Sequence, residues 1–174
     1  MPTTGLMRKT PDSASARSPR AAGDTALDPL LTREFDREHV LMLELYNQAH
    51  LLLDGGDVQG AHHRLGSLLV RLRDHAARKE TVLYATLAER HTYDPFITAV
   101  LRDARELTLA LVHSAARHHS QSADPLMDGG LAEAFRAQLH SLGVELTRSM
   151  ELDASMLFPL YRKALLSMEQ PRVL

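Results

Sequence analysis

The 174-residue chain predicts an all-α fold, an up-down-up-down antiparallel four-helix bundle. Apolar residues recur at steps of three and four along four long segments, which is the spacing of a helix with one buried face. Polar stretches containing glycine or proline separate these segments, and strand patterns are essentially absent. Long helices with mostly short connections favour antiparallel neighbours in a bundle.

The composition excludes several classes of site. The chain has no Cys, so disulfides, thiolate catalysis, Cys-held zinc and iron–sulfur clusters are excluded. A formal net charge of -2 gives no reason to expect nucleic acid as a partner. No apolar run approaches the roughly 18 residues that span a bilayer, and no signal-peptide pattern is present, so we expect a cytoplasmic protein without a membrane partner. No nucleophile–base arrangement or phosphate-binding glycine loop indicates an enzyme.

The chain divides into a helical bundle and two tails. Residues 1–27 are rich in Ser, Pro, Ala, Thr and Arg without periodicity, which predicts a disordered N-terminal tail. The bundle is expected over residues 28–168, and residues 169–174 form a C-terminal tail. The oligomeric state is left open.

The first two helices are expected to be joined by a glycine turn. Asp28 and Pro29 are a start signal and Gly55-Gly56 a stop signal, which predicts a helix over residues 29–54. Asp57 caps a second helix that continues to about residue 90. The apolar spacing predicts inner faces of Phe35, His39, Met42, Tyr46, Ala49 and Leu53 in the first helix, and of Leu65, Leu68, Leu72, His75, Lys79 and Val82 in the second.

The last two helices are separated by a longer loop. Asp94 is a cap and Pro95 a first-turn residue, so a third helix is expected over residues 95–119. Residues 120–130 (SQSADPLMDGG) form the loop, and a fourth helix covers residues 131–168. The predicted inner faces are Val100, Ala104, Leu107 and Leu111 in the third helix, and Phe135, Leu139, Leu142, Leu146, Ser149, Asp153, Met156 and Leu160 in the fourth.

The second and fourth helices share one pattern, starting at position 75 (HAARKETVLYATL) and at position 149 (SMELDASMLFPLY). Each copy has a polar residue at its start, another polar residue four positions on, and then an aliphatic–aromatic pair. The polar pairs are His75 with Lys79 and Ser149 with Asp153, each on one helix face. Inward-facing polar groups on facing helices are how a bundle builds a metal or ionic site in its core.

These stretches resemble the bacterial hemerythrin-like (HHE cation-binding) proteins. The matching segments are residues 37–45 (REHVLMLEL), 73–87 (RDHAARKETVLYATL) and 152–161 (LDASMLFPLY), and the resemblance covers about residues 30–166. It implies a four-helix bundle around two irons. The ligands in that family are one His from the first helix, a His and a Glu four apart from the second, two His from the third, and a His and an acidic residue four apart from the fourth.

Carried over by position, the resemblance implies that His39, His75 and Asp153 are metal ligands, with Glu106 as the candidate from the third helix. Lys79 stands at the position of the second-helix Glu, and Ser149 at that of the fourth-helix His. An ammonium has no lone pair and repels a cation. These two departures argue against a full di-iron site.

Three interpretations of Lys79 remain open at this point. Lys79 pairs with Asp153 across a metal-free core, in a hydrogen-bonded network with His39, His75 and Ser149. Alternatively, Lys79 extends along its stem to the surface. In the third interpretation a reduced site of His39, His75 and Asp153, with or without Glu106, holds one Fe, Mn or Zn ion.

Three functions are also open at this point. The first is a small sensory or regulatory protein with a degenerate or reduced metal site, which acts through a protein partner. The second is an iron protein that handles oxygen, nitric oxide or iron through a non-heme site. The third is a metal-free adaptor for a transcription component such as a sigma factor, since residues 37–47 and 142–153 also resemble bacterial regulators of the primary sigma factor.

Overall fold

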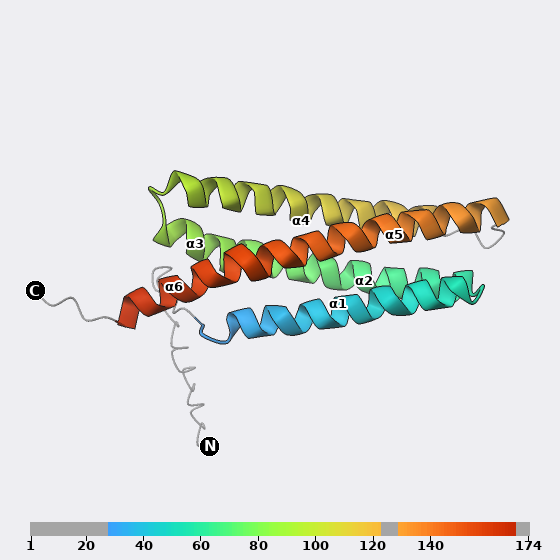
Figure 1. Cartoon of the computed structure of the whole chain (residues 1–174), viewed down its shortest axis with the longest axis horizontal. Helices are drawn as coiled ribbons and strands as arrows, with labels where there is room; N and C mark the ends of the chain where they lie inside the picture. The colour runs from blue at the N-terminus through green and yellow to red at the C-terminus, as the bar shows by residue number, and fades with distance from the viewer. Residues whose placement is uncertain (1–27, 123–128, 170–174) are drawn as a thin grey trace, which may run out of the picture.

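The computed structural model describes residues 28–122 and 129–169, which form four helical rods (Figure 1). The first rod is α1 (Leu31–Asp54). The second comprises α2 (Val58–Arg78), the π-helical segment η1 (Lys79–Tyr84) and α3 (Ala85–Arg90). The third is α4 (Pro95–Gln121), and the fourth comprises α5 (Gly129–Leu152), the π-helical segment η2 (Asp153–Leu157) and α6 (Phe158–Glu169). No strand occurs in these ranges, so the all-α prediction is confirmed.

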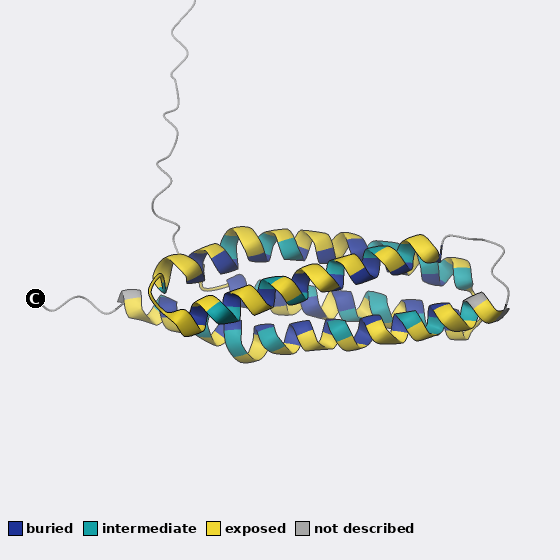
Figure 2. Ribbon diagram, turned by 90° about the horizontal axis from the view of Figure 1, so that it is seen from above, coloured by how far each residue is buried: buried dark blue, intermediate teal, exposed yellow. Residues whose placement is uncertain are grey.

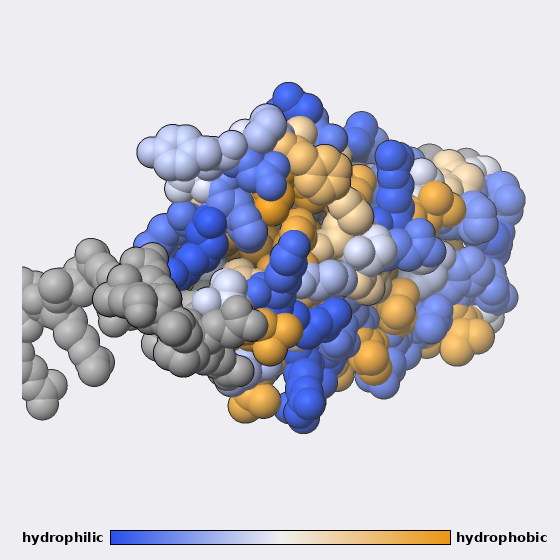
Figure 3. Space-filling view, turned by 60° about the vertical axis from the view of Figure 1, so that its left-hand side comes forward, coloured by the Kyte–Doolittle hydropathy of each residue, from blue (hydrophilic) through white to orange (hydrophobic). Residues whose placement is uncertain are grey.

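The rods lie side by side along the long axis of the molecule, and Figure 1 shows the α1–α2 turn and the α3–α4 turn at opposite ends. The predicted N-terminal tail over residues 1–27 lies outside the described residues, as does the predicted C-terminal tail (169–174) beyond Glu169, which is the last residue of α6. Within the described part of the chain, no helix is long and apolar enough to cross a membrane. The face toward the α3–α4 turn is mainly hydrophilic with an apolar patch in its middle (Figure 3), and the aromatic residues Tyr93 and Phe96 at this turn are exposed.

The predicted turn residues act as expected at three helix ends. Asp57 accepts a hydrogen bond from the backbone N–H three residues on, at 2.8 Å, and Asp94 caps the first two free N–H groups of α4. Gly56 has φ +84°, a left-handed conformation that glycine adopts without steric cost. The first helix begins at Leu31, two residues later than predicted, because the side chain of Asp28 bonds the N–H of Leu30 in a preceding turn.

The buried residues lie on the inner sides of the rods (Figure 2) and form two apolar clusters with a polar layer between them. The first cluster lies toward the α1–α2 turn and includes Met42, Leu72, Leu111 and Met150. The second lies toward the α3–α4 turn and includes Phe35, Leu83, Ala104 and Leu157. The polar layer, as we call it below, consists of buried His39, His75, Lys79, Thr108 and Asp153.

Each π-helical segment begins at the polar layer, at Lys79 in one rod and at Asp153 in the other. A π-helical turn contains more residues than an α-helical turn, so it shifts the inner face of the helix beyond it. The predicted inner positions beyond this point are only half-buried, and their C-terminal neighbours fill the core instead. These pairs are Val82 and Leu83, Met156 and Leu157, and Leu160 and Tyr161.

In the third helix, two of the predicted inner positions are also displaced, and the buried residue is the one that follows each of them in the sequence. Val100 and Leu107 are half-buried, whereas Leu101 and Thr108 are buried. The rest of the predicted face agrees with the structure, since Ala104 and Leu111 are both in the core. As a result, α4 presents a hydroxyl group to the polar layer where the sequence predicts a leucine.

Tyr46 of α1 lies directly over Gly143 of α5, where a Cβ atom at position 143 would overlap the tyrosine ring. We expect Gly143→Ala to lower the free energy of unfolding by about 1–2 kcal/mol, because the ring must move out of a packed contact. In a Tyr46→Leu background the same change should instead stabilise the protein by up to about 1 kcal/mol, since Ala favours a helix more than Gly does. Denaturant unfolding of the four proteins measures both effects. An equal effect in the two backgrounds would contradict this account.

Candidate metal centre

Asp153 lies at the centre of the polar layer, and its two carboxylate oxygens face different groups. Oδ1 accepts a hydrogen bond from Lys79 Nζ at 2.6 Å. Oδ2 lies 3.2 Å from His39 Nε2 and 3.7 Å from His75 Nε2. Asp153 is 0% exposed and Lys79 1% exposed, so water does not screen this group. One carboxylate therefore joins an ammonium group on one oxygen to two imidazoles on the other.

Lys79 has a complete polar environment in the core. Its ammonium also donates to Thr108 Oγ1 at 3.2 Å and lies 5.4 Å from the centroid of the Tyr84 ring. The Tyr84 hydroxyl is in turn 3.1 Å from Thr108 Oγ1. The predicted ion pair between Lys79 and Asp153 is present in the core, so the interpretation in which Lys79 reaches the surface is wrong. The ion pair satisfies the charge of Lys79 inside the bundle.

His75 is held from its other side by Glu38 of α1. The His75 Nδ1 atom lies 2.7 Å from Glu38 Oε2. An ionised carboxylate can only accept a hydrogen bond, so Nδ1 carries the proton and Nε2 faces Asp153. The two imidazoles are fixed by aromatic contacts, His75 edge-on to Phe35 at 5.1 Å between ring centroids and His39 stacked on Phe158 at 5.8 Å.

The facing donor atoms of His39, His75 and Asp153 lie within 4.8 Å of one another. His39 Nε2 and Asp153 Oδ2 are fully enclosed and lie 3.2 Å apart, and neither atom has another hydrogen-bond partner among the described residues. Buried polar atoms are normally paired, and these two pair with each other only when His39 Nε2 carries a proton. Two imidazoles and one carboxylate are a donor set that transition-metal ions use.

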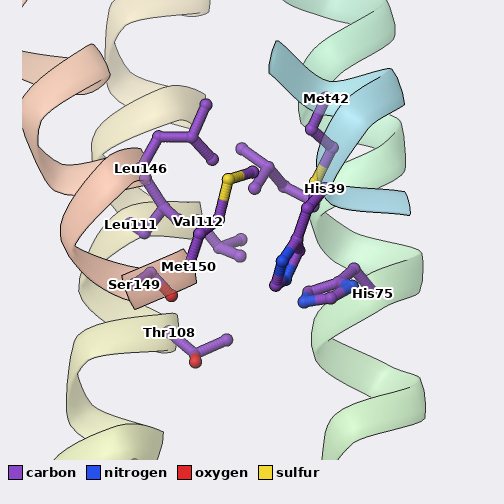
Figure 4. A pocket seen from close by; sticks show the side chains of 10 residues that line it. His39, Met42, His75, Thr108, Leu111, Val112, Leu146, Ser149 and Met150 are labelled. Carbon is purple, nitrogen blue, oxygen red and sulfur yellow. The ribbon is translucent and has the colours of Figure 1, made fainter. Parts of the chain in front are cut away.

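A cavity of about 10 Å³ adjoins the two histidines and is roughly the size of one water molecule. Figure 4 shows the His39 and His75 rings pointing toward each other, with the Ser149 and Thr108 side chains across the cavity from them. The remaining lining is apolar: Met42, Leu72, Leu111, Val112, Leu146 and Met150. Ser149 is buried as predicted, but no hydrogen bond joins it to the polar layer among the residues that the structure describes.

Glu106 does not lie with the other candidate ligands. It is exposed on α4 and outside the group formed by His39, His75 and Asp153. Residues two positions apart on an α-helix point roughly 200° apart, and Thr108 is the residue that α4 turns toward the core. The prediction of Glu106 as a fourth ligand is therefore corrected, since its carboxylate is on the wrong side of the helix.

Sequence reasoning missed two residues of this site, Glu38 and Thr108. Glu38 lies at the edge of the apolar face of α1, where a glutamate is usually solvated, and its only signal is its place directly before His39. Thr108 follows a leucine that fits the same helical spacing almost as well. Both gain their roles from contacts with other helices rather than from a local pattern.

Burial alone would raise the pKa of Asp153, but the contact with His39 and the charge of Lys79 outweigh burial and hold this pKa well below its usual range. A carboxyl whose pKa is lower in the folded than in the unfolded state adds stability above its unfolded pKa of about 4, and this stability is lost as the pH falls toward the folded pKa.

We therefore expect wild-type protein to lose more stability than Asp153→Asn when the pH falls from about 5 to about 2. The asparagine variant starts from a lower stability at neutral pH, because it leaves the Lys79 ammonium without its carboxylate. Denaturant unfolding at a series of pH values measures both curves. Parallel curves would show that Asp153 does not have a lowered pKa.

The whole polar layer falls within one match to known protein families. The family model for the hemerythrin HHE cation binding domain matches residues 30–161, from the start of α1 into α6. No curated protein and no solved structure matches the chain. The match covers well over half of the sequence and includes every helix that contributes to the site. The chain therefore belongs to the hemerythrin HHE cation-binding family.

Proposed function

We propose that the core of this protein binds one divalent transition-metal ion between His39, His75 and Asp153. The observation that carries this proposal is the convergence of three donor atoms in a closed core, two of which have no hydrogen-bond partner other than each other. Fe, Mn or Zn suits two imidazoles and a carboxylate. When bound, such an ion supplies Lewis-acid chemistry and, in the case of iron, electron transfer. The α1–α2 and α3–α4 turns at opposite ends of the bundle in Figure 1 support the up-down-up-down topology that the sequence predicts.

The residues fit one ion and do not fit a pair. Lys79 and Ser149 stand where the family resemblance implies a carboxylate and an imidazole, and Glu106 points outward. The ammonium of Lys79 already takes the second oxygen of Asp153, at 2.6 Å. Asp153 thus lies between the ammonium group of Lys79, which is part of the protein, and the proposed position of the metal ion. Lys79 replaces the positive charge of a second metal without providing a ligand.

We further propose a sensory or regulatory role, with occupancy of the site detected by a protein partner. The cavity of about 10 Å³ supports this, because it leaves no room for an organic substrate beside the histidines. The same cavity supports a second candidate, a non-heme iron protein that handles oxygen or nitric oxide, since its apolar wall could admit only a very small molecule. A third candidate is the metal-free adaptor. The ion pair of Lys79 and Asp153 supports it, because the two opposite charges balance each other without a metal.

Metal content tests the proposal. Protein stripped with a chelator and titrated with Fe(II) without oxygen, or with Zn(II), should bind about one equivalent by calorimetry and elemental analysis. His39→Ala and His75→Ala should each abolish this binding, because two of three donors cannot hold the ion in competition with water. His113→Ala is the control, since His113 is exposed on α4.

Other stoichiometries decide between the alternatives. Two equivalents with an oxo-bridged absorption band would replace the single-ion site with a di-iron site. No binding to any of these ions would leave the metal-free adaptor, and the search would then turn to co-purifying proteins such as a sigma factor.

A further inference from the structure

A series of charged contacts connects His75 to the surface. Arg78 of α2 donates to Glu34 at 2.6 Å through Nη2 and to Glu38 Oε1 through Nη1, and its guanidinium lies 5.2 Å from the centroid of the Phe35 ring. Glu38 uses its other oxygen, Oε2, to accept the hydrogen bond from His75. The contacts tie α1 to α2 beside the polar layer.

This arrangement fixes the direction of Glu38. A guanidinium that bonds one oxygen of a carboxylate holds that carboxylate in a single orientation. The remaining oxygen then requires a proton on His75 Nδ1. In a neutral imidazole this leaves the lone pair on Nε2, the nitrogen that lies 3.7 Å from Asp153 Oδ2.

We propose that Glu38, held by Arg78, is the positioning residue that keeps His75 in the tautomer with the lone pair on Nε2 and aimed at the metal site. This inference rests on the proposed function, because a lone pair directed at Asp153 and His39 is useful when a cation lies between them. Without Glu38, no residue described at this nitrogen favours the Nδ1 proton over the Nε2 proton. Groups that orient a metal-binding His in this way affect affinity by about 10–100-fold.

Glu34 provides a matched control within the same contacts. It also pairs with Arg78, but it does not touch His75. Glu34→Ala therefore removes one partner of the guanidinium and leaves the Glu38–His75 bond in place. A purely structural role for the surface charges would make Glu34→Ala and Glu38→Ala similar, whereas the proposed role makes only Glu38→Ala affect His75.

The tautomer is measured on metal-free protein with ¹⁵N-labelled histidine, by long-range ¹H–¹⁵N spectra at a pH above the titration of the imidazoles. His75 of wild-type protein and of Glu34→Ala should show a protonated Nδ1 and an unprotonated Nε2. In Glu38→Ala the proton should move to Nε2 in most molecules, because no carboxylate oxygen then accepts a hydrogen bond from Nδ1. A wild-type His75 with its proton on Nε2 would overturn the proposal even if no variant folds.

Titration with Zn(II) or Co(II) provides the second readout. Glu38→Ala should bind about 10–100-fold more weakly than wild type, while Glu34→Ala should stay close to wild type. Equal weakening by both variants would assign the effect to surface charge and refute the positioning role. If wild-type protein binds neither ion, the proposed function fails, while the spectra of metal-free protein still decide whether Glu38 sets the tautomer.

Discussion

Replacing Lys79 with Met should lower the free energy of unfolding of the metal-free protein by about 3–5 kcal/mol. The physical reason is that the negative charge of Asp153 would stay buried without its cation. Asp153 is completely buried and its Oδ1 has Lys79 Nζ at 2.6 Å. Methionine fills a similar volume but leaves the carboxylate with two imidazoles only on its other oxygen. Denaturant unfolding at neutral pH, after removal of metal, measures the effect.

Two further variants separate charge from packing. Lys163→Met is the matched control, because Lys163 is exposed on α6, and its effect should lie within about 0.5 kcal/mol of zero. Combining Lys79→Met with Asp153→Leu removes both charges and should recover most of the lost stability, since apolar replacement of a whole buried pair is often neutral or stabilising. If Lys79→Met is as stable as wild type, the buried ion pair does not exist.

Changing Lys79 to Glu should make folding depend on metal. The substitution places a second carboxylate beside Asp153, and two buried like charges cannot both stay ionised without a cation. The metal-free variant should therefore be at least as unstable as Lys79→Met. Zn(II) or Fe(II) should restore its stability, because a metal that binds only the folded state raises the free energy of unfolding. Thermal unfolding with and without one equivalent of metal measures this dependence.

The same variant should bind metal more tightly than wild type. Removing an ammonium near the ion and adding a carboxylate changes the local charge by two units, and a unit charge pair at 4 Å contributes about 4 kcal/mol at an effective dielectric constant of 20. Even after losses to desolvation, we expect a gain on the order of 100-fold in affinity. Lys79→Gln, which is neutral, should fall between the two proteins. An affinity unchanged by Lys79→Glu would mean that the ion does not lie beside Asp153.

Adding Ser149→His to Lys79→Glu restores the family residue types at the two departing positions of the second and fourth helices. The double variant should take up more metal than wild type, and elemental analysis gives the stoichiometry. A double variant without any metal would show that positions 79 and 149 are not aligned with ligand positions of the family.

The sequence predicted the parts of this fold that depend on local chemistry. Asp57 and Asp94 cap helices because their side chains reach backbone groups within the next three residues, and no other segment is needed for that. The ion pair was also predictable, since a Lys and an Asp that interrupt apolar faces of two long helices must find partners inside the bundle.

The π-helical segments could not be predicted in this way. Residues 79–84 (KETVLY) contain no glycine or proline and fit an α-helix as well as a π-helix, so the shift from Val82 to Leu83 has no local signal. It results from packing, because Lys79 must reach Asp153 while the aromatic residue at position 84 fills the next layer of the core. The same reasoning applies at Asp153 in the facing rod, where Leu157 and Tyr161 lie in the second apolar cluster.

The polar layer between the two apolar clusters has a consequence for how the protein opens. Each cluster holds one half of the bundle together through its own apolar burial, and the two halves meet at hydrogen bonds and charges rather than at a continuous hydrophobic contact. Such halves behave as separate cooperative units, whose amide protons exchange at different free energies of opening. An ion held by His39 of α1, His75 of α2 and Asp153 of η2 would couple the two units into one. Amide hydrogen exchange at the α3–α4 turn would then slow on metal binding. Binding of an ion in the buried core would thus change the dynamics of the surface at one end of the molecule.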